Sequence, residues 1–242
     1  MSLKATGAGT CLHADTASRA SFKGGNLAEL LVIRHGQASF GQDNYDVLSD
    51  LGHRQSEAVG TLLRDLNWVP DRLVTGTLKR QKDTLSSMGF EQAPEEHAGL
   101  NEYDFADLLY ARFKGEVPDL VKGDRKVHFR TLKETVYEWQ DDAFDGAAET
   151  YGAFTQRVQA ARQFATDTDA KRVLVVSSGG VIGQMTSVAL GAPKRQMMNL
   201  NLQIKNTAMT RFMFSGTAFS LHEFNATPHF MSPEGAGLLS YS

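Results

Sequence analysis

The feature that most constrains the fold is a pair of short, wholly apolar runs, Leu-Leu-Val-Ile at residues 30–33 and Val-Leu-Val-Val at residues 173–176. Such runs, rich in β-branched residues, are typical of strands in a parallel sheet, which are buried on both faces and need no alternation of polar and apolar side chains. An Arg-His-Gly sequence at 34–36 follows the first run and Ser-Ser-Gly-Gly at 177–180 follows the second. Because ligands bind at the carboxyl ends of strands in such sheets, both exits are candidates for a functional site.

The segments around these runs have the spacing of helices and of a hairpin. Helices are predicted at 49–66 with Ser49 as the N-cap, at 77–88, through Phe154, Val158, Ala161 and Phe164, and from Gly179 to about 190. A short strand is predicted near 71–76, and a hairpin at a sheet edge from 207–214 and 218–224. The tail from Asn225 shows no strong pattern. The order of elements predicts an α/β fold, a three-layer sandwich with a mostly parallel sheet and helices on both faces.

Length and composition suggest one domain. The chain has 242 residues, of which 41% are hydrophobic, enough for an ordinary core. Residues 1–26 are small and polar and are expected to form a flexible N-terminal extension, leaving 27–242 as a single domain with a cap insertion at about 103–149. Basic residues gather between 111 and 133 and acidic ones between 134 and 149. The insertion is either a binding lid or a solvated pair of helices whose charges neutralise each other.

The charge and the hydropathy pattern exclude several classes of protein. A formal net charge of −3 and a pI near 6.2 argue against a nucleic-acid binder that relies on general attraction to phosphates. No run approaches the roughly 18 apolar residues of a membrane helix, and the start of the chain lacks the apolar core of a signal peptide. A single cysteine, Cys11, excludes an intramolecular disulfide and a thiolate metal cluster within one chain. We therefore expect a soluble, intracellular protein.

Three strand exits are expected at one edge of the sheet, and they carry a coherent chemistry. Arg34 and Arg80 converging there would form a cradle for an oxyanion such as phosphate. His35 between them could act as a nucleophile toward phosphorus, because a neutral imidazole attacks well once the phosphoryl charge is neutralised. The helix start at Gly179 adds backbone N–H groups and a positive dipole end. Each residue taken alone could equally serve a structural role, as a salt bridge or a loop hydrogen bond.

Four ordered motifs resemble those of a known family. They are Arg-His-Gly at 34–36, Leu-Ser-Asp-Leu-Gly-His-Arg-Gln at 48–55, Thr-Gly-Thr-Leu-Lys-Arg at 75–80 with Thr84, and Leu-Asn-Glu at 100–102. Together they resemble the histidine phosphatase superfamily, which includes the cofactor-dependent phosphoglycerate mutases, over roughly residues 30–224. The resemblance implies His35 as the phosphorylated nucleophile, Arg34 and Arg80 as phosphate ligands and Glu102 as the proton donor to the leaving group. It also implies a cytoplasmic enzyme without a metal. We expect no cofactor.

The departure from the family pattern is Ser178, where members usually carry a second phosphate-binding histidine. The candidate phosphate ligands are therefore Arg34, Arg80, Ser178 and Gly179, with Ser178 expected to face His35. A serine hydroxyl can donate one hydrogen bond but carries no charge. Losing a hydrogen bond from a charged donor costs about 1.5–3 kcal/mol, or roughly 10- to 100-fold in rate if all of it is lost in the transition state.

Three functions follow from this pattern. The first is a phosphomonoester hydrolase that acts on a small phosphorylated metabolite through phospho-His35, with activity reduced by Ser178. The alternative is a catalytically weak protein that binds a phosphorylated ligand or has a regulatory role. A phosphoglycerate mutase is a further alternative. It is disfavoured because a mutase must rebind a bisphosphate in the opposite orientation, which requires a complete phosphate site, and Ser178 leaves that site without its second histidine. Nucleotide binding through 178–183 is weaker still, because the glycine spacing misses the dinucleotide fingerprint.

The same pattern sets the expected partners. We expect a small phosphorylated substrate, with neither nucleic acid nor membrane, and we consider a homodimer formed through an edge strand.

Overall fold

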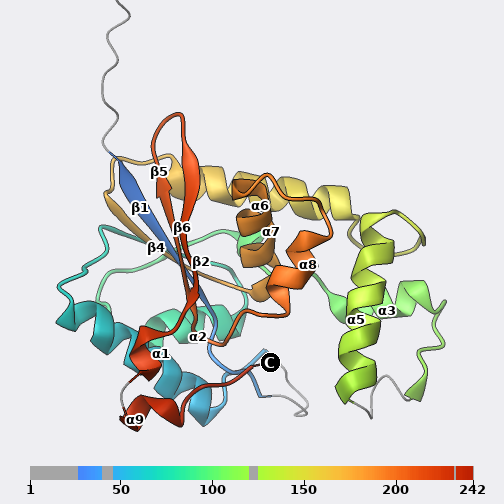
Figure 1. Ribbon diagram of the computed structural model, residues 1–242, viewed down its shortest axis with the longest axis horizontal. Helices are drawn as coiled ribbons and strands as arrows, with labels where there is room; N and C mark the ends of the chain where they lie inside the picture. Colours follow the sequence, from blue (N-terminus) through green and yellow to red (C-terminus); the bar gives the residue numbers. More distant parts are fainter. Residues whose placement is uncertain (1–26, 40–45, 120–124, 232, 242) are drawn as a thin grey trace, which may run out of the picture.

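A six-stranded sheet in the order β3-β2-β4-β1-β5-β6 forms the centre of the protein (Figure 1). The structure is a computed structural model that describes residues 27–39, 46–119, 125–231 and 233–241. The strands are β1 (Ala28–Arg34), β2 (Arg72–Thr75), β3 (Glu95–Glu96), β4 (Arg172–Ser177), β5 (Met209–Phe214) and β6 (Phe219–Ala226). The expected N-terminal extension, with Cys11, lies outside the described residues.

The first four strands are parallel, and their carboxyl ends meet at one edge of the sheet. Val176 of β4 pairs in register with Ile33 of β1 on one side and with Thr75 of β2 on the other. The three predicted exits therefore begin at the same level. Strands β5 and β6 form the predicted hairpin, and β5 pairs antiparallel with both β1 and β6. Because the pairs among β1 to β4 are parallel, the prediction of a mostly parallel sheet is confirmed.

Helices cover both faces of this sheet, which confirms the three-layer architecture. The helices are α1 (Asp50–Asp65), α2 (Lys79–Ser87), α3 (Phe105–Arg112), α5 (Arg125–Gln140), α6 (Tyr151–Thr166), α7 (Gly179–Ala189), α8 (Gln196–Asn201) and α9 (Pro233–Ala236), with short 3-10 turns η1 (Ala98–Leu100) and η2 (Pro228–Phe230). Leu31 and Ile33 of β1 pack in a core with residues of α1 and α2. Leu30 and Val32 point the other way, into a larger core with α6, α7 and α8. Successive side chains of a strand serve opposite faces, so the uninterrupted apolar run is buried on both.

Helix α1 begins as the sequence predicts. The side chain of Ser49 accepts a hydrogen bond of 3.1 Å from the backbone N–H of Gly52, which is the contact of an N-cap. Val59 and Leu63, one turn apart, are buried on the face toward the sheet. This helix fixes the loop that follows β1, because Gly36 approaches it closely. A Cβ at Gly36 would lie 2.5 Å from the carbonyl oxygen of Gly52.

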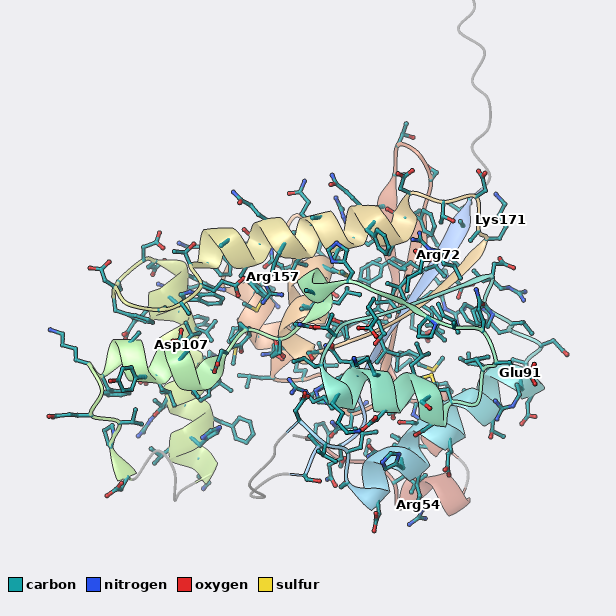
Figure 2. The ribbon with its side chains drawn as sticks, turned by 180° about the vertical axis from the view of Figure 1, so that it is seen from behind. Arg54, Arg72, Glu91, Asp107, Arg157 and Lys171 are labelled. Atoms are coloured by element: carbon teal, nitrogen blue, oxygen red, sulfur yellow. The ribbon has the colours of Figure 1, made fainter. Side chains whose placement is uncertain are left out.

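Helices α3 and α5 stand to one side of the sheet, within the range predicted as an insertion (Figure 1). Figure 2 shows Asp107 on α3, whose carboxylate accepts a hydrogen bond of 2.7 Å from the N–H of Ala148. Arg112 pairs with Glu138 at 2.6 Å and lies 3.7 Å from Glu134, both on α5. The charge of Arg112, in the basic half of the insertion, is therefore neutralised by carboxylates of the acidic half.

The end of the chain is more ordered than its sequence indicates. Residues after β6 form η2 and α9, and α9 lies beside α1 in Figure 1. His229 and Phe230 of η2 are buried. Segments of three and four residues are too short to show a period, which is why the sequence pattern missed them.

None of the described helices has the length and apolar character needed to cross a membrane.

Candidate active site

His35 is buried at the end of β1, and its hydrogen bonds define which ring nitrogen can react. Its Nδ1 lies 2.8 Å from the carbonyl oxygen of Gly36. A carbonyl only accepts, so Nδ1 carries the proton and Nε2 holds a lone pair. Nε2 in turn lies 3.2 Å from Nε of Arg80, which donates to it. The arrangement presents a neutral imidazole whose Nε2 is directed at a guanidinium.

The pKa of His35 lies well below its usual value of 6.5. Burial is the largest cause, because it disfavours the charged form, and the positive charges of Arg80 and Arg34 act in the same direction. The hydrogen bond to the Gly36 carbonyl opposes this shift. His35 is therefore neutral at neutral pH, which is the state a nucleophile requires.

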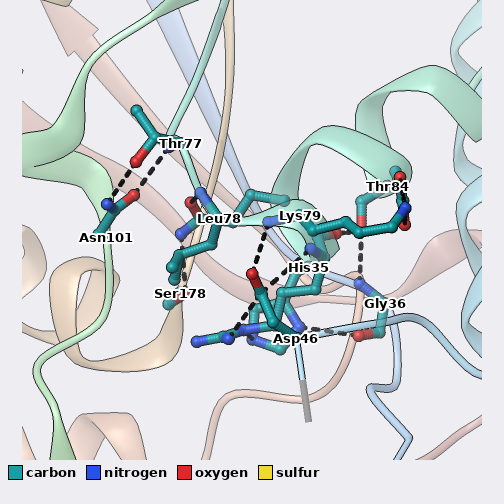
Figure 3. A network of polar contacts seen from close by, with 12 residues as sticks. His35, Gly36, Asp46, Thr77, Leu78, Lys79, Thr84, Asn101 and Ser178 are labelled. Atoms are coloured by element: carbon teal, nitrogen blue, oxygen red, sulfur yellow. Dashed lines mark hydrogen bonds and ion pairs between the residues drawn. The ribbon is translucent and has the colours of Figure 1, made fainter. Parts of the chain in front are cut away.

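Two arginines flank the histidine, as the sequence predicts, and each is held by a different part of the chain. Arg34 ends β1 and donates through Nη1 to the carbonyl of Ile204. Arg80 lies in the first turn of α2, where its Nη1 pairs with Asp46 at 2.9 Å. The other oxygen of Asp46 accepts from the backbone N–H of Lys79, so one carboxylate both caps α2 and orients Arg80 (Figure 3). Nothing in the sequence pattern pointed to Asp46.

Glu102 lies beside the start of α7. One carboxylate oxygen accepts a hydrogen bond of 2.9 Å from the backbone N–H of Gly180. The other accepts a hydrogen bond of 3.2 Å from the backbone N–H of Tyr103. Loss of solvation raises the pKa of Glu102, and the Gly180 hydrogen bond and the two arginines offset part of that effect. A raised pKa favours the protonated form that a proton donor needs. The Gly180 N–H is thereby committed to Glu102.

Arg157 of α6, labelled in Figure 2, supports the segment that carries Glu102. It donates to the carbonyls of Asn101 at 2.6 Å and Gly99 at 3.2 Å. Its charge is balanced by Glu149, at 2.5 Å. Glu102 is thus held through its backbone as well as through its side chain.

Ser178 is fully buried at the end of β4, and its hydroxyl contacts Gln81 of α2. Gln81 Nε2 donates to Ser178 Oγ at 2.8 Å and to the carbonyl of Leu100 at 2.9 Å. Gln81 is itself fully buried. The contact expected for Ser178 was with His35, whereas the contact in the structure is with this carboxamide. Gln81 gave no signal in the sequence, since a lone glutamine in a helix is usually a surface residue.

Gly179 is the first residue of α7, and two side chains lie close to its Cα. A Cβ at this position would lie 2.2 Å from Oδ1 of Asn201 and 3.7 Å from Cζ of Arg34. Asn201 ends α8, and its Nδ2 donates to the hydroxyl of Tyr103 at 3.0 Å. Gly179 therefore lies directly against the Arg34 side of the site, and Asn201 is a neighbour of the site that sequence reasoning did not identify.

These contacts bring all the predicted residues to one edge of the sheet. A neutral imidazole, two guanidinium groups, a carboxyl group with a raised pKa and a helix N-terminus lie together, a set suited to phosphoryl transfer, in which positioned cations stabilise charge on the transferred group. In the part of the chain that the structure describes, no group of three or more His, Cys, Asp or Glu side chains could hold a metal ion.

The fold and this set of residues define a phosphoryl-transfer class of protein, and comparison with known families names the family. Residues 30–227 match the model of the histidine phosphatase superfamily (branch 1), and the chain belongs to that family. The resemblance seen in the sequence motifs is confirmed, and the match supports the predicted class, a histidine phosphatase-type phosphomonoesterase.

A curated relative aligns with part of the chain. It is the 2,3-bisphosphoglycerate-dependent phosphoglycerate mutase of Chelativorans sp. (strain BNC1), 32% identical over 90 residues. The alignment covers 33% of this chain and 44% of that protein, so the chain matches less than half the length of this relative.

Solved structures share the fold over most of their length. A phosphoserine phosphatase mutant of Entamoeba histolytica has a TM-score of 0.61 at 18% identity, covering 84% of this chain and 98% of the other. A putative α-ribazole-5′-phosphate phosphatase of Escherichia coli has a TM-score of 0.61 at 21% identity, covering 82% and 96%. A mycobacterial glucosyl-3-phosphoglycerate phosphatase has a TM-score of 0.59 at 20% identity, covering 83% and 99%.

Proposed function

We propose that the protein is a phosphomonoester hydrolase that acts on a small phosphorylated metabolite through a phosphohistidine at His35. The observation that carries this proposal is the pair of contacts on the imidazole, with Nδ1 bonded to the Gly36 carbonyl and Nε2 facing Arg80. In this tautomer the reactive lone pair lies beside a cation that can neutralise an incoming phosphoryl group.

The first half-reaction transfers the phosphoryl group to the enzyme. Nε2 of His35 attacks phosphorus, the bond between phosphorus and the ester oxygen breaks, and the proton of Glu102 passes to the departing alkoxide. Arg34 and Arg80 stabilise the charge on the phosphoryl oxygens, with Ser178 and Gly179 as the remaining phosphate ligands. In this proposal Arg80 exchanges its contact with His35 Nε2 for one with the substrate phosphate.

The second half-reaction returns the enzyme to its starting state. The Glu102 carboxylate takes a proton from water as the water oxygen attacks phosphorus. The N–P bond to His35 breaks, and inorganic phosphate leaves. Glu102 thus serves as acid and then as base, which a carboxyl group with a raised pKa can do near neutral pH.

The principal test is trapping of the phosphoenzyme. Acid-labile phosphate should appear on His35 when the protein is mixed with a chromogenic phosphomonoester and quenched after milliseconds to seconds. His35→Ala should yield neither the phosphoenzyme nor turnover. If the parent binds inorganic phosphate but forms no phosphoenzyme and no product, the alternative of a catalytically weak phosphate-ligand-binding or regulatory protein is correct.

A panel of substrates separates phosphatase from mutase activity. Phosphoserine, α-ribazole 5′-phosphate and glucosyl-3-phosphoglycerate represent the substrates named for the structural neighbours, and 3-phosphoglycerate with its bisphosphate represents the mutase alternative. We expect release of inorganic phosphate rather than transfer between phosphoglycerates, because Ser178 supplies no second cationic ring to hold a bisphosphate. We also propose that the enzyme works in the cytoplasm.

A further inference from the structure

The loop that carries His35 is held on both sides of Gly36 by residues distant in the sequence. On one side, the carbonyl of His35 accepts hydrogen bonds of 3.4 Å from the backbone N–H of Thr207 and from Nδ2 of Asn206. On the other side, the N–H of Gln37 donates to Oε1 of Gln55 at 2.9 Å. Gln55 and Asn206 are fully buried.

Ser240, near the end of the described chain, joins these two supports. Its hydroxyl accepts from Nε2 of Gln55 at 2.8 Å and donates to Oδ1 of Asn206 at 3.0 Å. Its carbonyl accepts from the N–H of Asn206 at 3.1 Å, and Gln55 Nε2 also donates to the carbonyl of Leu238 at 2.7 Å. Each donor and acceptor in this chain of contacts has one consistent role, so the amide orientations of Gln55 and Asn206 are determined.

The contact at Gln55 acts on the nucleophile through a single peptide plane. The peptide between Gly36 and Gln37 presents its N–H to Gln55 and its carbonyl to Nδ1 of His35. Because a peptide unit is planar, rotation of this unit moves both groups together. Fixing the N–H of Gln37 therefore fixes the acceptor that determines the tautomer and the ring orientation of His35.

We propose that Gln55, Asn206 and Ser240 form a clamp that positions His35 for attack, so that the C-terminal segment from 238 to 240 takes part in catalysis without touching the substrate. These three are positioning residues, and their catalytic consequence rests on the proposed role of His35 as the nucleophile. Leu238 of this segment is buried, with 7% of its surface exposed, so the segment keeps an apolar contact when Ser240 is substituted.

The test compares Ser240→Ala with a matched control, Ser220→Ala, which removes an exposed hydroxyl from β6. In Ser240→Ala we expect the rate of phosphoenzyme formation to fall roughly tenfold, as expected for the loss of two neutral hydrogen bonds. The KM and the inhibition constant of inorganic phosphate should stay within about twofold, since Arg34 and Arg80 are untouched. Ser240→Thr, which keeps the hydroxyl, should restore most of the rate, and Ser220→Ala should match the parent.

A second measurement reports on the clamp whether or not the protein is an enzyme. Hydrogen exchange of the Gln37 amide, followed by NMR, should be faster in Ser240→Ala than in the parent and unchanged in Ser220→Ala. Unchanged exchange would overturn the clamp, and so would a parental rate of phosphoenzyme formation in Ser240→Ala. If the parent itself forms no phosphoenzyme, the proposed function fails, and the exchange rate of Gln37 still decides whether the clamp exists.

Discussion

Gln81 Nε2 donates a hydrogen bond of 2.8 Å to the hydroxyl of Ser178, at the position where members of the family usually carry a histidine. Both side chains are fully buried, and the carboxamide of Gln81 is also bonded to the carbonyl of Leu100. Gln81 therefore occupies space next to Ser178 that a larger side chain at 178 would need. Because the Ser178 hydroxyl oxygen accepts this hydrogen bond, the hydroxyl proton points away from Gln81.

A histidine introduced at position 178 should work only when Gln81 is shortened. Ser178→His alone should lower the stability by about 1–3 kcal/mol through overpacking and give little gain in turnover. Adding Gln81→Ala should recover stability and raise turnover by roughly 10- to 100-fold, because the imidazolium can then donate a charged hydrogen bond to phosphate. Turnover and urea denaturation of the two single variants and the double variant measure this coupling. If Gln81→Ala changes turnover and stability as much in the parent as in the Ser178→His background, the two positions are independent.

Removal of the proposed proton donor, Glu102, should affect substrates according to their leaving groups. Glu102→Gln should lower kcat for an alkyl phosphate by roughly 10²–10⁴-fold, the usual contribution of general acid catalysis. The loss in the phosphorylation step should be much smaller for 4-nitrophenyl phosphate, whose leaving phenolate needs little protonation. Rapid-quench rates of phosphoenzyme formation with both substrates test this, and an equal loss for both would assign Glu102 a role other than proton donor.

The pH dependence of kcat/KM should be bell-shaped, with limbs set by His35 and Glu102. The proposed mechanism requires a neutral His35 and a protonated Glu102. Activity should therefore be lost on the acid side as pH falls through the pKa of His35, which lies well below 6.5. It should fall on the alkaline side as pH rises through the pKa of Glu102, which is raised above 4.5. Glu102→Gln cannot titrate and should lose the alkaline limb. An alkaline limb that persists in this variant, with the same midpoint, would belong to another group.

Stability should fall in mild acid because His229 is buried in its neutral form. Burial lowers the pKa of His229 from 6.5 to about 4, and its Nε2 lies 3.0 Å from the hydroxyl of Thr207. Between these two pKa values the unfolded state binds more protons than the folded state, so the free energy of unfolding falls as pH falls from about 6.5 toward 4. At pH near 4.5 the loss attributable to His229 is roughly 2–3 kcal/mol.

His229→Gln should remove that part of the pH dependence. Urea denaturation of the parent and the variant at pH 7 and near pH 4.5 isolates it, because the contribution of His35 is common to both proteins and cancels. If the two proteins lose equal stability on acidification, His229 is not the group responsible.

The local sequence pattern was sufficient to predict the strands and the helix start that position the site. The apolar runs of β1 and β4 and the Ser49 cap of α1 are strong signals, and they lie where the sequence predicts. The convergence of Arg34, His35 and Arg80 follows from a general property of parallel sheets, so it could be predicted without any side-chain detail.

The residues that hold the site residues in place could not be predicted from the sequence pattern. Asp46, Gln81 and Asn206 are ordinary polar residues whose roles depend on which segment of the chain packs against them. The carboxylate of Asp46 caps a helix 33 residues away, and Gln81 meets Ser178 across 97 residues. Hydrogen bonds over such separations leave no periodic trace in a single sequence.

The strand order has a consequence for how the chain reaches its native state. β1 is formed by residues near the start of the described chain, yet its two neighbours are β4 (Arg172–Ser177) and β5 (Met209–Phe214). During synthesis the apolar run at residues 30–33 therefore has no native partner on either edge until most of the chain has left the ribosome. Sheets built from such distant segments form slowly, and an unpaired apolar strand is prone to aggregate in the meantime. The residue proposed as the nucleophile follows directly on this segment, so its local geometry is completed late in folding.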